Sequence, residues 1–243
     1  LNDALRATVV TVALLVALWR GLDLERLGVL FAEAKLGWLV LAVGMVPLQM
    51  VLGGCRWARV TADLGLALDR AHAITEYGLS MGLNAVMPGG MAGDAVRVWR
   101  HRRGHGSLGE PLRAAVVERL IGHWTHLTVT ALGLLLWSTI HGVSPPPGSP
   151  VLVVVIILVF GFIWTWPVPG LRSLVEDTRV ALGSPARLCV HGALSLTLMA
   201  SILFAFWACA MALNLPLGLG VFTAVPLLML VLVLPFSIGG WGL

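Results

Sequence analysis

Four charged residues in the middle of the chain have the types and the spacing of an anion-binding site. Asp94 and Arg97 lie about one helical turn apart, and Glu118 and Arg119 are adjacent at the start of a later apolar segment. An arginine guanidinium binds a phosphate or carboxylate through a planar fork of N–H donors, and a nearby carboxylate can orient it. Two interpretations remain open: the four side chains hold an anionic ligand group, or their ion pairs only fasten neighbouring helices together.

The sequence just before Asp94 predicts a break between two helices. The segment that begins at Asn84 contains Pro88 and three glycines, of which Gly93 immediately precedes Asp94, and such residues end helices. We expect Asp94 to be the N-cap of the returning helix, whose free N–H groups favour anions. The side chain of Asn84 is expected to bond the backbone freed by the break, with a ligand contact as the alternative.

A second break of the same type lies near the end of the sequence, in Leu-Pro-Phe-Ser-Ile-Gly-Gly-Trp-Gly. Its candidate site residues are Pro235, Ser237, Gly239 and Gly240. A serine beside a proline can hydrogen-bond backbone groups that the proline leaves free, so Ser237 is expected to act at this break as Asn84 does at the first.

No pattern in the sequence predicts a catalytic centre or a metal site. The chain has no nucleophile elbow and no His-Glu-x-x-His motif, and its three cysteines form no Cys-x-x-Cys pair. His123 and His126 share one helix face, but Glu118 lies five residues before His123 and is turned away from that face. We therefore expect no enzymatic activity and no cofactor.

The composition explains which elements must position these residues. Of 243 residues, 58% are apolar and 12% are charged, and the mean hydropathy is +0.92. Residues 120–171 and 188–243 contain no Asp, Glu, Lys or Arg. A water-soluble fold cannot bury so much apolar surface, which excludes a soluble enzyme. Excess arginine in such a chain is typical of cytoplasmic loops, so its net charge of +4 does not indicate a nucleic-acid partner.

The sequence therefore predicts an all-α polytopic membrane protein, because about 20 apolar residues suffice for one spanning helix. Apolar segments occur at 4–19, 36–54, 71–93, 114–137, 150–166, 188–210 and 220–235.

The arginines between these segments predict the topology. The N-terminus and the loops 55–70, 97–119 and 167–187 are expected in the cytoplasm, whereas 138–149 and 211–219, which lack Lys and Arg, are expected outside the inner (cytoplasmic) membrane. Segment 71–96 must then begin and end on the same side. We interpret it as a re-entrant hairpin broken at Pro88, with one kinked crossing as the alternative.

The spacing of the two breaks indicates an inverted repeat within a single membrane domain, 1–243. Pro88 and Pro235 are 147 residues apart, and this shift superimposes several apolar segments of about 1–137 on those of about 150–243. It also superimposes two amphipathic stretches, expected in the membrane interface, that begin near Leu24 and Leu171. The two halves run in opposite senses, each with a Pro/Gly-broken re-entrant hairpin. The second repeat lacks its fourth element, so we expect it to be C-terminally incomplete.

Four motifs together resemble the transmembrane domain of lysylphosphatidylglycerol synthases, which also occurs alone in flippase-like proteins. They are Arg56-Trp57, Asn84-x-x-x-Pro-Gly-x-x-x-Gly-Asp-x-x-Arg97, Glu118-Arg119-x-x-Gly122 and Leu234-Pro-x-Ser-x-Gly-Gly-x-Gly. The likeness covers essentially the whole chain, although the family pattern usually has Gly-Gly-Asp where this chain has Ala92-Gly93-Asp94. The resemblance implies transport of aminoacylated or other anionic phospholipids between leaflets, without the soluble aminoacyl-transferase domain.

Three functions remain open at this point. The first is a flippase-like protein that binds or translocates anionic phospholipid or lipid-linked phosphate. The second is a non-transporting module that holds a lipid for a membrane-associated partner, a glycosyltransferase or an aminoacyltransferase. The third is an ion-coupled transporter of small solutes with Asp94 as the coupling carboxylate. The sequence names neither the headgroup nor the oligomeric state.

Overall fold

A computed structural model describes residues 28–30, 32–86, 92–102, 108–165, 172–215 and 217–233. These residues form helices and connecting turns and contain no strand. The helices are α3 (Leu36–Asp63), α4 (Arg70–Val86), α5 (Ala92–His101), α6 (Gly109–Leu135), α7 (Trp137–His141), α8 (Ser149–Thr165), α9 (Arg172–Leu182), α10 (Pro185–Ala212), η2 (Gly218–Phe222) and α11 (Ala224–Val233). The predicted apolar segment 4–19 and the candidate residues Pro88, Pro235, Ser237, Gly239 and Gly240 lie outside the described residues.

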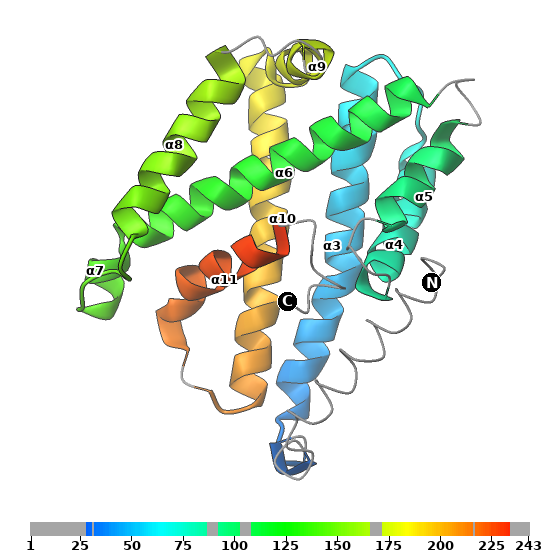
Figure 1. Cartoon of the computed structure of the whole chain (residues 1–243). Coiled ribbons are helices and arrows are strands. Elements are labelled where there is room, and N and C mark those ends of the chain that lie inside the picture. Colours follow the sequence, from blue (N-terminus) through cyan, green and yellow to red (C-terminus); the bar gives the residue numbers. More distant parts are fainter. Residues whose placement is uncertain are drawn as a thin grey trace, which may run out of the picture.

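The two long helices α3 and α10 form the centre of the molecule (Figure 1). Each has 28 residues, and they run antiparallel, since the Lys35 N–H donates to the Ala212 carbonyl at one end and Asp63 pairs with Arg187 at the other. Among the described helices, these two are long and apolar enough to cross a membrane. The all-α membrane architecture predicted from the composition therefore stands, and both spans extend beyond the predicted 36–54 and 188–210.

The outward faces of α3, α8, α10 and α11 carry exposed apolar side chains. Val40 and Val43 on α3 and Leu196 on α10 are more than half exposed, as are Leu158 on α8 and Leu228 on α11. Exposed apolar surface of this extent marks an interaction with a partner or with lipid rather than with water.

Helix α6 crosses the central pair diagonally and reaches from α5 to α8 (Figure 1). Its N-terminal half packs with α3 and the short helix α9 in a cluster of Val60, Val117, Ile121 and Ala181, against which Leu174 also packs. Helix α9 begins where the second amphipathic stretch was predicted; that it lies in a membrane interface stays a prediction.

Helices α4 and α5 form an antiparallel pair beside α3. The Arg100 guanidinium contacts Glu76, and the His101 Nε2 atom lies 3.4 Å from the Ala67 carbonyl oxygen. The pair therefore begins and ends at the C-terminal end of α3. Pro88, where the sequence predicts the break, lies between the end of α4 at Val86 and the start of α5 at Ala92, outside the described residues. That both ends lie on the cytoplasmic side of a membrane stays a prediction.

Small residues allow α4 to approach α3 closely. A Cβ atom added at Gly54 would lie 2.5 Å from the Cα atom of Ile74, whereas one added at Gly44 of the same helix would meet nothing within 4 Å. We expect Gly54→Val to destabilise the protein by about 1–3 kcal/mol, because the α3–α4 backbones must separate. Thermal unfolding in detergent measures this loss, with Gly44→Val as the matched control. Equal melting temperatures for the two variants would contradict the close packing.

Candidate functional site

Glu118 of α6 lies between two arginines from other helices. Its Oε1 atom accepts hydrogen bonds from Arg56 of α3, from Nε at 2.8 Å and from Nη2 at 2.5 Å. Its Oε2 atom accepts one from Arg97 Nη2 of α5 at 2.9 Å. Arg56 also donates to the hydroxyl of Ser195 on α10 at 3.2 Å. One buried carboxylate thus connects α3, α5 and α6, and through Arg56 also α10.

Asp94 of α5 is the second carboxylate of the cluster. Its Oδ1 atom lies 3.0 Å from Arg97 Nη2, and its Oδ2 atom pairs with Arg119 of α6. The Ser80 hydroxyl donates to Oδ1 at 3.2 Å, and Asn84 Nδ2 donates to Oδ2 at 3.4 Å. Asp94 therefore joins the α4–α5 pair to α6.

The prediction that Asp94 is an N-cap is wrong. Helix α5 begins at Ala92, so Asp94 lies inside its first turn. Asn84 takes part of the capping role, because its Oδ1 atom accepts the Gly93 N–H at 2.8 Å. Asn84 therefore bonds the backbone at the break, as expected, and leaves the Asp94 carboxylate to the arginines.

The Arg97 guanidinium is enclosed rather than open to a ligand. The residue is 1% exposed, and its Cζ atom lies 4.7 Å from the Trp57 ring centre and 5.2 Å from that of Tyr77. Its Nε and Nη1 atoms have no hydrogen-bond partner among the described residues, and the two aromatic faces stabilise the cation instead. In this arrangement Arg97 fastens α5 to α3 and α6.

Gly122 makes room for this cluster. A Cβ atom at position 122 would lie 3.0 Å from Arg56 Nη2. The Glu118-Arg119-x-x-Gly122 motif therefore has a steric reason, since the glycine lies one turn after Glu118 and lets the Arg56 side chain reach the carboxylate.

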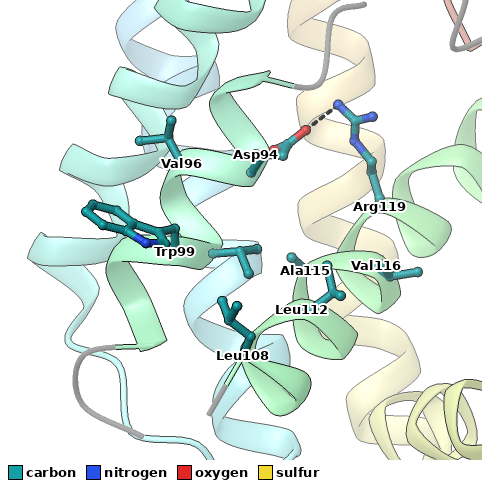
Figure 2. A pocket seen from close by; sticks show the side chains of 10 residues that line it. Asp94, Val96, Trp99, Leu108, Leu112, Ala115, Val116 and Arg119 are labelled. Atoms are coloured by element: carbon teal, nitrogen blue, oxygen red, sulfur yellow. Dashed lines mark ion pairs between the residues drawn. The ribbon is translucent and has the colours of Figure 1, made fainter. Parts of the chain in front are cut away.

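A pocket of about 630 Å³ separates α5 from α6 next to this cluster. Asp94 and Arg119 face each other at one end of the pocket, and the labelled residues Val96, Trp99, Leu108, Leu112, Ala115 and Val116 line the rest (Figure 2). The Arg119 side chain is one-third exposed. The pocket thus combines a charged end with apolar walls, and Arg119 is the arginine of the cluster that lines it.

A second polar cluster joins α3 to α10 at the same end of the molecule. The Asp63 carboxylate lies 3.3 Å from Arg187 Nε and 2.9 Å from His191 Nε2, and Arg59 Nε donates to it at 3.1 Å. These contacts hold the C-terminal end of α3 against the first turns of α10. They do not line the pocket between α5 and α6.

The structure brings together five of the residues selected from the sequence: Asn84, Asp94, Arg97, Glu118 and Arg119, with Gly93 at the first turn of α5. Sequence reasoning left out Arg56, Tyr77 and Ser195 as site residues. Arg56 had a signal in the Arg56-Trp57 motif, whereas Tyr77 and Ser195 reach the cluster only through the packing of α4 and α10.

His126 of α6 packs against α11. His126 is 5% exposed, and its Nε2 atom lies 2.8 Å from the Pro226 carbonyl oxygen of α11. In the described part of the chain, no group of three or more His, Cys, Asp or Glu side chains could hold a metal ion.

These features define an all-helical membrane protein that has a buried cluster of ion pairs beside an apolar pocket. The sequence matches the family described as the lysylphosphatidylglycerol synthase TM region over residues 4–243, and the chain belongs to this family. Membership indicates a membrane protein associated with lipid handling, and the matched region is the flippase-like domain rather than the catalytic one. No curated protein and no solved structure shows significant similarity to the chain.

Proposed function

We propose that this protein binds an anionic phospholipid at the Asp94–Arg119 end of the pocket and moves it between the two leaflets of the membrane. The observation that carries the proposal is the excess positive charge of the cluster. Among the described residues, three guanidinium groups (Arg56, Arg97 and Arg119) contact two carboxylates (Glu118 and Asp94), so these five groups together carry a net charge of +1. A phosphodiester headgroup with one negative charge would balance it, and ionisable residues within a membrane domain most often mark a substrate path.

The position of the cluster along α3 supports a headgroup as its ligand. Leu36–Cys55, the first part of α3, contains no charged side chain, and these residues span about 30 Å, the thickness of the hydrocarbon core. Arg56 follows immediately. If α3 crosses the membrane, its arginine and the contacts to Glu118 lie close to the level of one layer of headgroups.

The distribution of arginines supports a cytoplasmic location for this end. Arg59, Arg100, Arg113 and Arg187 lie around it. The other end has Lys35 just before α3, and its turns at residues 142–148 and 213–215 contain no Lys or Arg. An excess of basic residues is typical of the cytoplasmic side. The domain would then receive its lipid from the inner leaflet of the cell membrane.

The arrangement of helices is compatible with an inverted repeat. Helices α3 and α10 have equal lengths and opposite directions, and each is followed by a helix that packs back against it, α4 and α11. A repeat of this kind supports exchange between two orientations of a central site. The re-entrant character of the α4–α5 pair belongs to the same proposal, because the pair leaves and returns to one end of α3.

The proposal includes no chemical step by this chain. Its alternative is a domain that holds a lipid for a membrane-associated transferase without transporting it. Both functions require binding at the charged end of the pocket, so transfer between leaflets is the property that separates them.

A transfer assay in vesicles tests the proposal. The full-length protein is reconstituted in phosphatidylcholine vesicles with a trace of acyl-labelled fluorescent phosphatidylglycerol, and dithionite quenches label in the outer leaflet. We expect label from both leaflets to be quenched, and more slowly when the labelled lipid is acyl-labelled phosphatidylcholine, which carries no net charge. Quenching of the outer leaflet alone, as in vesicles without protein, would contradict transport, and lipid binding without transfer would favour the holding module.

A further inference from the structure

The pocket between α5 and α6 has a shape and lining that the charged cluster alone does not require. Across the pocket the two helices are connected by ion pairs at one end, Arg97–Glu118 and Asp94–Arg119. The remaining walls are apolar, with Leu108 and Leu112 about half exposed. A surface cleft of this composition is unfavourable in water but suits hydrocarbon.

We infer that this pocket binds one acyl chain of a membrane phospholipid while the phosphate of the same lipid replaces Asp94 as the partner of Arg119. The inference rests on the proposed function and deepens it by assigning the chain site. The volume of about 630 Å³ lies within the usual range of small-molecule sites. Its occupant follows from the lining: the walls accept a hydrocarbon chain, and the guanidinium at the end accepts a phosphate.

The contacts of Asp94 explain how a lipid phosphate can replace it as a partner of Arg119. Asp94 has a second guanidinium partner in Arg97 and accepts hydrogen bonds from Ser80 and Asn84. It therefore stays compensated when Arg119 turns to a lipid phosphate. Asp94 is an internal competitor for Arg119: it occupies the guanidinium when no lipid is bound and regains it when the lipid leaves.

A pocket-filling variant tests the chain site. Ala95 is exposed and lines the pocket, and Ala200 is exposed on α10 away from it. We measure binding of dioctanoyl phosphatidylglycerol to the full-length protein in detergent. Ala95→Trp should weaken binding about ten-fold or more, because losing two buried methylene groups costs about that much. Ala200→Trp should bind as the unchanged protein does, and equal binding by both variants would overturn the chain site.

The separate parts of the lipid test the shared site. Glycerol phosphate lacks acyl chains and should bind far more weakly than dioctanoyl phosphatidylglycerol. Dioctanoylglycerol lacks the phosphate. Its binding should be unaffected by Arg119→Gln but weakened by Ala95→Trp. Glycerol phosphate binding as tightly as the lipid would show a free-anion site and overturn the inference.

Asp94→Asn tests the competition. Removing the carboxylate charge should tighten binding of dioctanoyl phosphatidylglycerol about five-fold. The reason is that the partly exposed Asp94–Arg119 pair stabilises the lipid-free protein by up to about 1 kcal/mol, and this pair must break before the phosphate can bind Arg119. Unchanged or weaker binding would overturn the role of Asp94 as a competitor. If the unchanged protein binds no phosphatidylglycerol at all, the proposed function fails; if it binds and only Ala95→Trp has no effect, the chain site fails alone.

Discussion

Replacing Glu118 by Gln should destabilise this protein more than any other single loss of charge that we consider. The carboxylate is 1% exposed and is shared by Arg56 and Arg97. Without its charge, two buried guanidinium groups lose their common partner, which typically costs about 3–5 kcal/mol. We expect the melting temperature in detergent to fall by about 10 °C or more, or the folded protein to be lost on purification.

Glu110 provides a matched control on the same helix, because it is exposed at the first turn of α6. Glu110→Gln should unfold within a degree or two of the unchanged protein, as expected of surface substitutions. A melting temperature of Glu118→Gln as high as that of Glu110→Gln would refute the assignment of Glu118 as the link between α3, α5 and α6.

Arg119→Gln should leave the fold intact and strongly reduce lipid transfer. Arg119 is one-third exposed and lines the pocket, so its loss removes no buried charge pair. A hydrogen bond to a charged phosphate contributes about 1.5–3 kcal/mol. We therefore expect phosphatidylglycerol transfer in the vesicle assay to fall by about ten-fold or more.

Two further variants make this result specific. Arg113→Gln is the same change on the same helix, but Arg113 pairs with Asp177 of α9 outside the pocket, so its transfer rate should stay near that of the unchanged protein. Arg119→Lys keeps the positive charge without the planar fork and should retain part of the activity. Full transfer by Arg119→Gln would remove Arg119 from the lipid site and leave its pair with Asp94 as a fastening only.

The long helices follow from the sequence because each contains a stretch of apolar residues that only a membrane or a core can accept. Helices α3 and α10 were predicted within 36–54 and 188–210. In the structure α3 continues past residue 54 through Arg56 to Asp63, and α10 begins at Pro185 and contains Arg187. Arg56 and Arg187 continue the helices because their charges are paired by Glu118 and Asp63 in the folded state. The hydropathy of the sequence does not predict these ion pairs.

That α4 and α5 are two helices was predicted from Pro88 and its glycines. The selection of Asp94, Arg97, Glu118 and Arg119 follows from charge in an apolar context. Their spacing along the chain also places Arg97 one turn after Asp94. These are local properties, since proline, glycine and helix periodicity act within a few residues.

The division of roles within the cluster depended on the tertiary structure. Asp94 became a partner of two arginines because Asn84, from the other helix of the pair, bonds the Gly93 N–H. Arg97 became enclosed because Trp57 and Tyr77 come from helices distant in sequence. The pocket forms because α5 and α6, joined by the Arg97–Glu118 and Asp94–Arg119 pairs, leave a space that apolar side chains of both helices line. Contacts between distant segments set burial and pairing, and no local pattern encodes them.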